Sequence, residues 1–567
     1  MKENWQQQLQ TLLNCDLKTL YPLARSLNRK LEFYVGPTNS GKTYNAMQIL
    51  KEANSGLYLA PLRLLALEGY EDLKASNIEA SLITGEEQML NEDAAHVCST
   101  IEMLDFDLDV DVAVIDEVQM LADADRGWAW VNAIIGCPAK RIIMTGSVNA
   151  LDAVKRIAAY LDEDLEIVKH QRKNELKVLS KWTSLDKLED GTALIAFSRA
   201  DVLRLKHRLQ KNYSVSVIYG NLSPEVRRDE AQRFREKKSQ ILIATDAIAM
   251  GLNLPIQTIL FTTDTKFDGI SKRKITVNEI TQIAGRAGRF GHFEAGYLGA
   301  TRRDVLEHIT EEFDSPIKTI KPPFKVKINS TQLEALAAHI KTNSLTKVLK
   351  FFADNMYFSG PFQAANISSM IEAAKIVDTR FNLKLDDKYL LAQAPVTMKS
   401  NIILQAYEAY IASVIKKKPC HYKPSITLPK KAITQRDLLL VEDEVKKISL
   451  YLWLSYKLPE LFPDHDKAYI LRNSFNSFIE KSLKGNLIQD ESPKKPFPPR
   501  RTDDNKRPKD DAPRKNFSRK RDDERRPSDE TQRKTFPRKT DEDRKPKDDN
   551  QEKNVKKNYN PRRRKTI

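Results

Sequence analysis

The hydrophobic positions of this 567-residue chain follow one pattern over its first half and another over its second. In the first half, short apolar runs rich in β-branched residues alternate with longer helical stretches. The first five of these runs are 31–36, 56–61, 96–100, 111–117 and 141–147. Strands that are buried on both faces of a parallel sheet are apolar nearly throughout. We therefore predict a parallel α/β sheet in this block.

The same alternation returns further along the chain. Its apolar runs are 177–181, 192–197, 215–220, 240–246 and 258–263. Two such blocks in series predict two tandem parallel-sheet lobes, residues 31–165 and residues 166–320. We expect residues 1–30 to form a helical segment in front of them.

The β pattern fades after the second lobe. We predict that residues 317–329 are an extended linker, because Pro322 and Pro323 exclude a helix. Helical periodicity then extends over residues 325–484. We therefore predict an α-helical C-terminal region.

The composition changes again at the end of the chain. Residues 494–567 contain 28 Lys and Arg and 15 Asp and Glu, so they hold +13 of the net charge of +16. Few apolar residues are present to offset the chain entropy, and we predict that residues 485–567 form a disordered basic tail. Segments such as FPPRRTDDNKRP and FPRKTDEDRKP form an imperfect repeat. Two interpretations stay open, a tail that binds nucleic acid by charge and stacking and a flexible polyampholyte without a partner.

Several classes of protein are excluded by the composition. No run of about 18 apolar residues is present, so we expect no membrane span. The N-terminus lacks the apolar core of a signal peptide, and Glu3 and Asp16 argue against an organellar transit peptide. The four cysteines are far apart and form no CxxC pair, which argues against a disulfide framework and a zinc site. We therefore expect a reducing, cytoplasmic setting.

A glycine-rich loop, GPTNSGKT, joins the first predicted strand to a helix-compatible stretch. Its spacing is typical of a phosphate-binding loop, in which glycines let backbone N–H groups curl round phosphates. The expected ATP-binding residues are Gly36, Pro37, Thr38, Asn39, Ser40, Gly41, Lys42 and Thr43. We expect Lys42 to reach the β and γ phosphates and the Thr43 hydroxyl to bind Mg²⁺. The strand-loop-helix context disfavours the alternative of a chance glycine-rich turn.

The apolar segment VAVIDEVQM, residues 112–120, contains two adjacent acids. We expect Asp116 to hold Mg²⁺, and Glu117 to orient or deprotonate the attacking water. Gln119 is expected near the γ phosphate, where it would relay the presence of that group. Acids often flank strands as solubilising caps, so this pair alone is weak evidence for catalysis. It becomes strong evidence because a phosphate loop precedes it in the same predicted sheet.

The second lobe has no phosphate loop of its own but contains QIAGRAGR, residues 282–289. Arg286 and Arg289 are set among glycines, which suits arginines that reach across to ATP bound on the first lobe. Gln282 is expected to face the nucleotide as well. The alternative is a basic surface turn that binds phosphate backbone. Arginine fingers from the second lobe would make hydrolysis depend on lobe closure, which couples ATP turnover to movement.

In their order along the chain these motifs resemble those of superfamily-two helicases of the DExH-like type, over about residues 33–300. The matching segments are GPTNSGKT, APLRLLA (60–66), DEVQ (116–119), TGS (145–147), ALIAFSRA (193–200), ATDAIAMGLNLPI (244–256) and QIAGRAGR. The resemblance implies that both lobes are RecA-like and share one ATP site.

Finer phrases resemble the helicase of the mitochondrial RNA degradosome and its bacterial relatives, the suppressor-of-var-three-like family. They include GLNLPI and QIAGRAGRFG in the second lobe, and DDKYLLAQAPV (386–396) and SLYLWLSYKLPELFPD (449–464) in the helical region. The resemblance implies ATP-dependent, 3′ to 5′ unwinding of RNA in RNA turnover, with DNA or hybrid duplexes as alternative substrates and an exoribonuclease as a partner. Because no targeting peptide is visible, we expect a bacterial cytoplasm rather than a mitochondrion. The resemblance assigns no role to the charged-repeat tail, so that role stays open.

The same resemblance implies strand contacts by small hydroxyl groups and backbone N–H groups, which grip phosphates irrespective of sequence. The residues concerned are Pro61, Arg63, Thr84, Gly85, Thr100, Ser198, Arg199 and Thr245. Gly251 is expected to permit close approach of the nucleotide, and Asn253 to touch nucleotide or strand. Taken singly, each of these residues is better explained as a helix cap or a turn. Trp128 and Trp130 could stack on bases, but burial in the core is favoured.

Alternative functions share parts of this pattern. A DNA helicase, or a translocase that remodels without separating strands, would have every motor motif, and no strand-separating pin is recognisable. An RNA-binding scaffold would not need Lys42, Asp116 and Glu117. A small-molecule kinase would lack a second lobe that carries Arg286 and Arg289. The sequence therefore predicts an ATP-dependent RNA helicase.

Overall fold

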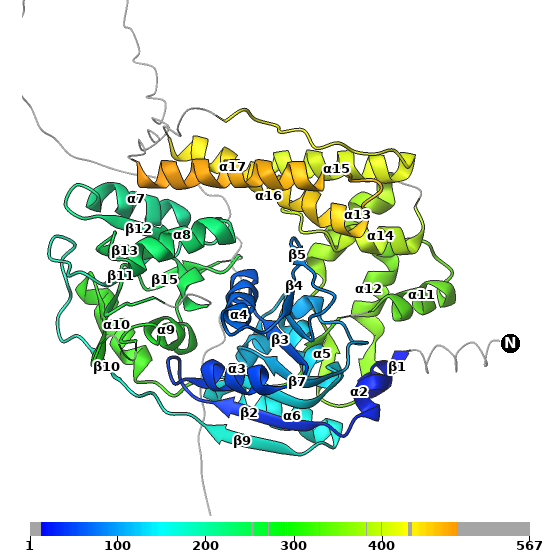
Figure 1. The fold of residues 1–567 in the computed structure, drawn as a ribbon, viewed down its shortest axis with the longest axis horizontal. Coiled ribbons are helices and arrows are strands. Elements are labelled where there is room, and N and C mark those ends of the chain that lie inside the picture. Colours follow the sequence, from blue (N-terminus) through cyan, green and yellow to red (C-terminus); the bar gives the residue numbers. More distant parts are fainter. Residues whose placement is uncertain are drawn as a thin grey trace, which may run out of the picture. The chain divides into compact units, whose positions relative to one another are not determined.

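The computed structural model describes residues 13–485. Within this range it leaves out 251–253, 270, 290, 292, 328, 381–382, 399 and 429–433. Gly251, Asn253 and the tail predicted to be disordered, apart from Gly485, therefore lie outside the described residues. Figure 1 shows the first lobe in blue to cyan, the second in green and the C-terminal region in yellow-green to orange.

An eight-stranded sheet forms the first lobe, in the order β5-β4-β6-β3-β7-β8-β2-β9. Its strands are β2 (Lys30–Val35), β3 (Gly56–Ala60), β4 (Ala80–Ile83), β5 (Gln88–Met89), β6 (His96–Thr100), β7 (Val110–Ile115), β8 (Ala139–Gly146) and β9 (Leu165–Lys169). Every neighbouring pair is parallel except β4 with β5. One face packs against α3 (Lys42–Glu52) and α4 (Arg63–Ala75), and the other against α5 (Gly127–Gly136) and α6 (Leu151–Leu161). The predicted parallel α/β sheet is confirmed.

All five apolar runs predicted for this lobe are strands, but three further strands were missed. One of them, β9, pairs in parallel with β2, so the first sheet extends to Lys169. The predicted lobe boundary at residue 165 is therefore wrong by one strand. The reason is that β9 lies at the sheet edge and only half buries its side chains, so it lacks the continuous apolar run of a central strand.

The second lobe contains a six-stranded, fully parallel sheet in the order β10-β17-β14-β11-β13-β12. Its strands are β10 (Glu175–Val178), β11 (Thr192–Ile195), β12 (Val215–Ile218), β13 (Ile241–Ala244), β14 (Thr258–Phe261) and β17 (Ala295–Ala300). Its helices are α7 (Arg199–Leu209), α8 (Pro224–Arg235), α9 (Val277–Ala284) and α10 (Arg303–Phe313), with an antiparallel hairpin of β15 (Thr265–Phe267) and β16 (Lys272–Lys274). Strand β17 was not predicted, because its sequence AGYLGA is poor in residues that favour strands.

The C-terminal region is helical, as predicted, and also contains short strands. Its helices are α11 (Ser330–His339), α12 (Leu345–Asn355), α13 (Ser368–Arg380), α14 (Leu385–Ala392), α15 (Asn401–Lys416), α16 (Gln435–Lys457) and α17 (His465–Lys484). Its strands are β18 (Phe324–Val326), β19 (Tyr357–Phe358) and β20 (Phe362–Ala364). The N-terminal segment, expected to be helical, contributes β1 (Asn14–Cys15) before a 3-10 turn, η1 (Leu17–Leu20), and helix α2 (Pro22–Ser26). Because β1 pairs with β19, the N-terminal segment is anchored on the C-terminal region.

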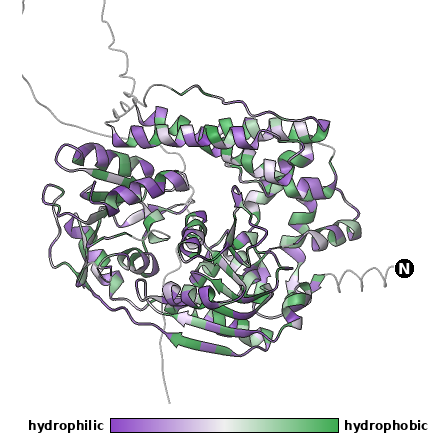
Figure 2. Cartoon of the chain, in the orientation of Figure 1, coloured by the Kyte–Doolittle hydropathy of each residue, from purple (hydrophilic) through white to green (hydrophobic). Residues whose placement is uncertain are grey.

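The C-terminal region divides its apolar side chains between the cores of the two lobes. Leu333 and Phe352, from its first half, pack in one cluster with the first lobe. Tyr407 and Phe478, from α15 and α17, pack in one cluster with the second lobe. Figure 2 shows hydrophobic and hydrophilic residues mixed along the helices of this region, and α16 is buried on all sides over residues 450–455. Among the described residues, no helix is both long enough and apolar enough to cross a membrane.

Candidate ATP site and nucleic-acid interface

The predicted phosphate loop lies between β2 and the N-terminus of α3. Gly41 caps that helix with a φ of +83°, a conformation that glycine adopts without strain. Gly36 begins the loop so close to the chain end of β9 that an added Cβ would lie 2.3 Å from the His170 carbonyl oxygen. The two glycines are therefore needed for the turn and for the close approach. The loop leads directly into the N-terminus of α3, where the free backbone N–H groups of a helix favour a phosphate.

Lys42, the first residue of α3, is held inside this loop. Its Nζ donates to the Pro37 carbonyl oxygen at 2.6 Å and lies 3.4 Å from the Ser40 hydroxyl. Burial lowers the pKa of Lys42, against the attraction of Glu117 and Asp116. The ammonium is thus poised beside the two acids of the neighbouring strand end.

Asp116 follows the C-terminal end of β7 and is almost fully buried. Its Oδ1 accepts from the Thr43 hydroxyl at 3.0 Å and from the Thr145 hydroxyl, and its Oδ2 accepts from the Tyr58 hydroxyl at 3.1 Å. The Trp130 indole donates to the Asp116 carbonyl oxygen at 2.9 Å. These donors fix the carboxylate next to the phosphate loop. Thr43 and Asp116, the two predicted Mg²⁺ ligands, are therefore in direct contact.

Glu117 opens the 3-10 helix η3 (Val118–Ala122) with a φ of +54°. A residue with a side chain rarely adopts this left-handed conformation, which is typical of functional sites that hold strain. Gln119 donates its amide to Glu117 Oε2, and its Oε1 accepts from the Ser147 N–H at 3.1 Å. Burial, followed by repulsion from Asp116, raises the pKa of Glu117. The strained backbone and the Gln119 bridge aim this carboxylate at the site.

The second lobe reaches the same carboxylate. Arg286 Nη2 lies 3.7 Å from Glu117 Oε1, while its Nε donates to the Ala249 carbonyl oxygen at 2.9 Å. Asn39 of the phosphate loop donates to the Gly285 carbonyl oxygen at 2.8 Å. A Cβ at Gly285 would lie only 2.6 Å from Thr38 Cβ, so the close approach depends on glycine. The structure thus brings the predicted residues of both lobes together.

The other predicted second-lobe residues differ from Arg286. The Arg289 guanidinium makes no ion pair or hydrogen bond with a described residue, although the Arg289 carbonyl oxygen accepts from the Phe293 N–H at 3.1 Å. Burial and repulsion from Arg235 lower the pKa of Arg289, against the attraction of Glu68. Gln282 Nε2 is buried and has no hydrogen-bond partner within the described part of the chain. An unpaired buried amide next to the phosphate loop is a donor suited to a polar ligand.

Arg172, in the segment that links the lobes, was not predicted. Its guanidinium donates to the Gly285 carbonyl oxygen at 3.0 Å and to the Ala287 carbonyl oxygen. It therefore holds the arginine segment of the second lobe from the direction of the first. Nothing in the sequence around Arg172 indicates this role, because the second-lobe carbonyl oxygens that it contacts lie more than 100 residues away.

The side chains that the structure gathers at this site have the chemistry needed to bind Mg²⁺ and ATP. Carboxylate and hydroxyl oxygens are the donors that Mg²⁺ prefers, and Thr43 Oγ1 and Asp116 Oδ1 lie 3.0 Å apart. Lys42 and Arg286 supply positive charge near the two acids, Lys42 from the phosphate loop and Arg286 from the second lobe. This arrangement is typical of a site for a nucleoside triphosphate with a divalent cation.

Most of the small residues predicted to contact a nucleic-acid strand make local structural bonds. Ser198 caps α7 by accepting from the Asp201 N–H at 3.0 Å, and Thr245 accepts from the Ala247 N–H at 3.3 Å. Thr84 closes a turn with Glu87. Gly85 lies beside the Trp453 ring, and the Pro61 carbonyl oxygen accepts from Arg126. Thr100 is buried and directly precedes η2 (Ile101–Met103).

The two arginines of that set are bound to glutamates. Arg63 Nη1 lies 2.6 Å from Glu86 Oε2, and Arg472 of α17 contacts the same carboxylate at 3.4 Å. Arg472 also lies 3.2 Å from Glu225 of α8, in the second lobe. We call Arg63, Glu86, Glu225 and Arg472 the three-way cluster, because it joins both lobes and the C-terminal region. Although burial opposes ionisation, Arg472 and Arg63 lower the pKa of Glu225.

Arg199 forms a second such contact. Its Nε lies 2.9 Å from Glu442 Oε2, and the Glu442 side chain is completely buried in α16. The Tyr219 hydroxyl donates to the same glutamate at 2.7 Å. Arg199 was predicted on the strand-contact face, but the structure commits its guanidinium to an ion pair that fastens α16 to the second lobe.

Three family models match the chain. The DEXQ-box helicase domain of Suv3 matches residues 18–170, and the helicase conserved C-terminal domain matches residues 174–291. The ATP-dependent RNA helicase SUV3 C-terminal domain matches residues 438–485. The matches thus cover both lobes and the last two helices.

Curated relatives extend the similarity to most of the chain. The DExH-box ATP-dependent RNA helicase DExH16, mitochondrial, of Arabidopsis thaliana is 35% identical over 486 residues, which are 83% of each chain. The mitochondrial ATP-dependent RNA helicase SUV3 of Candida albicans is 32% identical over 82% of this chain and 69% of its own. The human mitochondrial ATP-dependent RNA helicase SUPV3L1 is 33% identical over 83% of this chain and 61% of its own.

Proposed function

This chain is an ATP-dependent RNA helicase of the SUV3 family, and on that premise we propose that it moves along RNA in the 3′ to 5′ direction and separates duplexes. The direction and the separation of strands are supported by the order of motifs along the two lobes, which is that of DExH-type helicases. A DNA helicase, or a translocase that leaves duplexes intact, is the alternative that the experiment below addresses.

The contact between Arg286 and Glu117 is the observation that carries the proposed mechanism. It joins the second lobe to the carboxylate of the first at 3.7 Å. In this mechanism Glu117 accepts a proton from the attacking water, and Arg286 stabilises the charge that develops on the γ phosphate. Hydrolysis removes the group that attracts Arg286, so the lobes separate after each turnover.

The phosphate loop completes the proposed site. Lys42 would contact the β and γ phosphates, and Thr43 and Asp116 would hold a Mg²⁺ ion. That ion would neutralise phosphate charge and thereby make the γ phosphate a better electrophile. Asp116 keeps its orientation through Tyr58 and Thr43, so it is ready for the cation before ATP binds.

We further propose a role in RNA turnover together with an exoribonuclease. Unwinding releases a single strand, which an exoribonuclease can degrade where a duplex would stop it. A purified 3′ to 5′ exoribonuclease should shorten a stable RNA duplex only when this protein and ATP are both present. Equal digestion without ATP would contradict the proposed cooperation.

The expected compartment is corrected by the relatives. We expected a bacterial, cytoplasmic protein, because no targeting peptide is visible at the start of the chain. That expectation is contradicted, because the relatives described above are mitochondrial helicases and point to a mitochondrial location. The start of the chain therefore does not decide its compartment.

Strand displacement tests the proposed activity. RNA, DNA and hybrid duplexes with a 3′ or a 5′ single-stranded tail are mixed with the protein and ATP, and release of the labelled strand is followed. We expect ATP-dependent displacement of RNA from 3′-tailed substrates and none with Lys42→Ala, which lacks the phosphate-binding ammonium. Displacement of DNA alone would contradict the RNA substrate. Strand-stimulated ATP hydrolysis without displacement would favour the translocase.

A further inference from the structure

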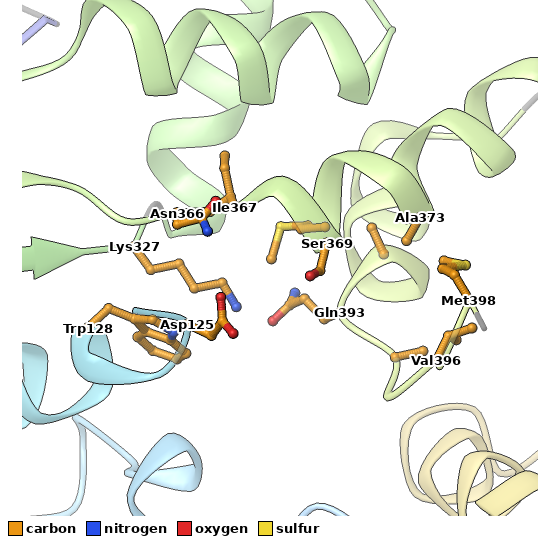
Figure 3. Close-up of a pocket in the computed structure, with 13 residues that line it drawn as sticks. Asp125, Trp128, Lys327, Asn366, Ile367, Ser369, Ala373, Gln393, Val396 and Met398 are labelled. Carbon is orange, nitrogen blue, oxygen red and sulfur yellow. The ribbon is translucent and has the colours of Figure 1, made fainter. Parts of the chain in front are cut away.

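A cavity of about 200 Å³ lies between the first lobe and the C-terminal region (Figure 3). Its apolar lining includes Val396 and Met398, and its polar lining includes Asp125, Lys327 and Gln393. Pockets that enclose whole small molecules typically measure roughly 300–1,000 Å³. At about 200 Å³ this cavity can therefore take only a small part of a larger ligand, such as one nucleobase, with the rest of the ligand outside it.

Lys327 is the unusual residue of this cavity. It follows the end of β18, and Figure 3 shows its side chain extended toward the centre of the cavity. Its Nζ lies 4.6 Å from the centroid of the Trp128 ring, but it makes no ion pair or hydrogen bond with any residue that the structure describes. Burial lowers the pKa of Lys327 to about 8, against the attraction of Glu102. An ammonium in these surroundings gains more from an anionic ligand than one on the open surface does.

The other polar groups suit the edge of a base. In Figure 3, Asp125 and Gln393 lie near the end of the Lys327 side chain. An aspartate accepts hydrogen bonds from an exocyclic amino group, as on cytosine, and an amide both donates and accepts. Because a carboxylate repels a phosphate and an ammonium attracts one, we assign the base edge to Asp125 and the adjacent phosphate to Lys327.

The position of the cavity connects it to the predicted path of the strand. Arg126, which follows Asp125, donates to the Pro61 carbonyl oxygen and to Glu102 Oε1, both at 2.6 Å. Pro61 belongs to the predicted strand contacts, and Glu102 follows another of them by two residues. The opposite wall includes residues 392–394 and Val396, which belong to the phrase DDKYLLAQAPV that the ATP site does not use.

We propose that this cavity binds one base of the RNA strand as the strand leaves the first lobe, with Asp125 accepting from the base and Lys327 contacting the adjacent phosphate. The inference rests on the proposed function, since it needs RNA bound along the first lobe. Because of Asp125, bases with an exocyclic amino group bind better than uracil.

Binding of labelled oligonucleotides to the full chain tests this site. In Lys327→Met the stem that packs on Trp128 is kept and only the charge is lost. We expect its Kd for a cytidine oligomer to rise about fivefold, and the slope of log Kd against log salt to fall by about 0.7, the value for one phosphate contact of a single strand. Lys325→Met removes the same charge from β18 outside the cavity and should leave both quantities unchanged.

Two further variants separate the base from the phosphate. Ser369→Phe fills the cavity from an exposed position of α13, and we expect weaker binding with an unchanged salt slope. Asp125→Asn should abolish the preference for a cytidine over a uridine oligomer. Wild-type affinity and salt slope in both Lys327→Met and Ser369→Phe would overturn the inference. If the wild type itself neither binds RNA nor hydrolyses ATP faster with RNA, the proposed function fails instead.

Discussion

At the ATP site the predicted residues from both lobes gather around the carboxylates of Asp116 and Glu117, whereas on the strand-contact face the predicted arginines are bound to glutamates. Arg286 stops 3.7 Å from Glu117, a distance that leaves its charge available to a phosphate. Arg63 is bound at 2.6 Å to Glu86. The same residue type is therefore poised for a ligand in one region and occupied by the protein in the other.

The difference follows from what surrounds each group. At the ATP site, Asp116 is held by hydroxyl donors, which orient a carboxylate without neutralising it. On the strand-contact face, Arg199 is paired with Glu442 of the C-terminal region and Arg63 with Glu86 of the first lobe. Removing one partner of a buried ion pair typically costs about 3–5 kcal/mol. A phosphate of RNA that displaces one of these glutamates must therefore offset a cost of that size.

The largest effect is expected at the ATP site, on the rate of ATP hydrolysis. Glu117→Gln should lower kcat for ATP hydrolysis at least about 100-fold, because the amide cannot accept the proton of the attacking water. Binding of a fluorescent ATP analogue should stay close to that of the wild type. Glu92→Gln makes the same chemical change at an exposed position of the first lobe and should leave kcat unchanged. Loss of ATP binding in Glu117→Gln would contradict its role as proton acceptor.

The second-largest effect is expected on the strand-contact face, at the ion pair of Arg199 with Glu442. Glu442→Gln leaves Arg199 without a counter-charge at a buried contact, and we expect the free energy of unfolding to fall by about 2–4 kcal/mol. Urea unfolding followed by tryptophan fluorescence measures this loss. Glu460→Gln, at an exposed position after α16 of the same region, provides a comparison. An equal loss of stability in the two variants would contradict a stabilising role for the ion pair of Arg199 with Glu442.

A smaller effect is expected in the three-way cluster. Glu86→Gln frees Arg63 from its closest partner, so we expect RNA to bind about three- to tenfold more tightly if this glutamate competes with phosphate. Fluorescence anisotropy with a labelled RNA oligomer measures the Kd. Glu87→Gln is the matched control, because Glu87 lies 3.9 Å from Arg63. Unchanged RNA affinity in Glu86→Gln would remove Arg63 from the strand-contact residues.

The smallest effect is expected in the pH dependence of the free energy of unfolding, through Glu68 near the ATP site. Glu68 of α4 faces Arg235 and Arg286 of the second lobe, and burial raises its pKa to about 7 although Arg235 opposes the shift. The folded protein then binds more protons at this site than the unfolded chain between pH of about 4.5 and 7, so stability falls as the pH rises through that window. Glu68→Gln should lack this fall and be about 1 kcal/mol more stable at pH 8. Parallel stability curves for the two proteins from pH 5 to pH 8 would contradict it.

The ATP site could be predicted because its signals are local in the sequence. The loop from Gly36 to Thr43 needs only its own spacing and the strand before it. Arg172, Tyr58 and Thr145 could not be assigned a role in the same way, because each reaches its partner through space. The missed strands have the same cause, since β9 and β17 lack the apolar run of a central strand and become strands by pairing with neighbours.

The sequence by itself determined the two parallel-sheet lobes, the helical C-terminal region and the chemistry of the phosphate loop and its two acids. Apolar runs and loop spacing carry that information along the chain. Only the tertiary structure decided that Arg199 is bound to Glu442, 243 residues away, and that the C-terminal region shares the cores of both lobes. Burial and ion pairing depend on residues that folding brings together, and no local pattern records them.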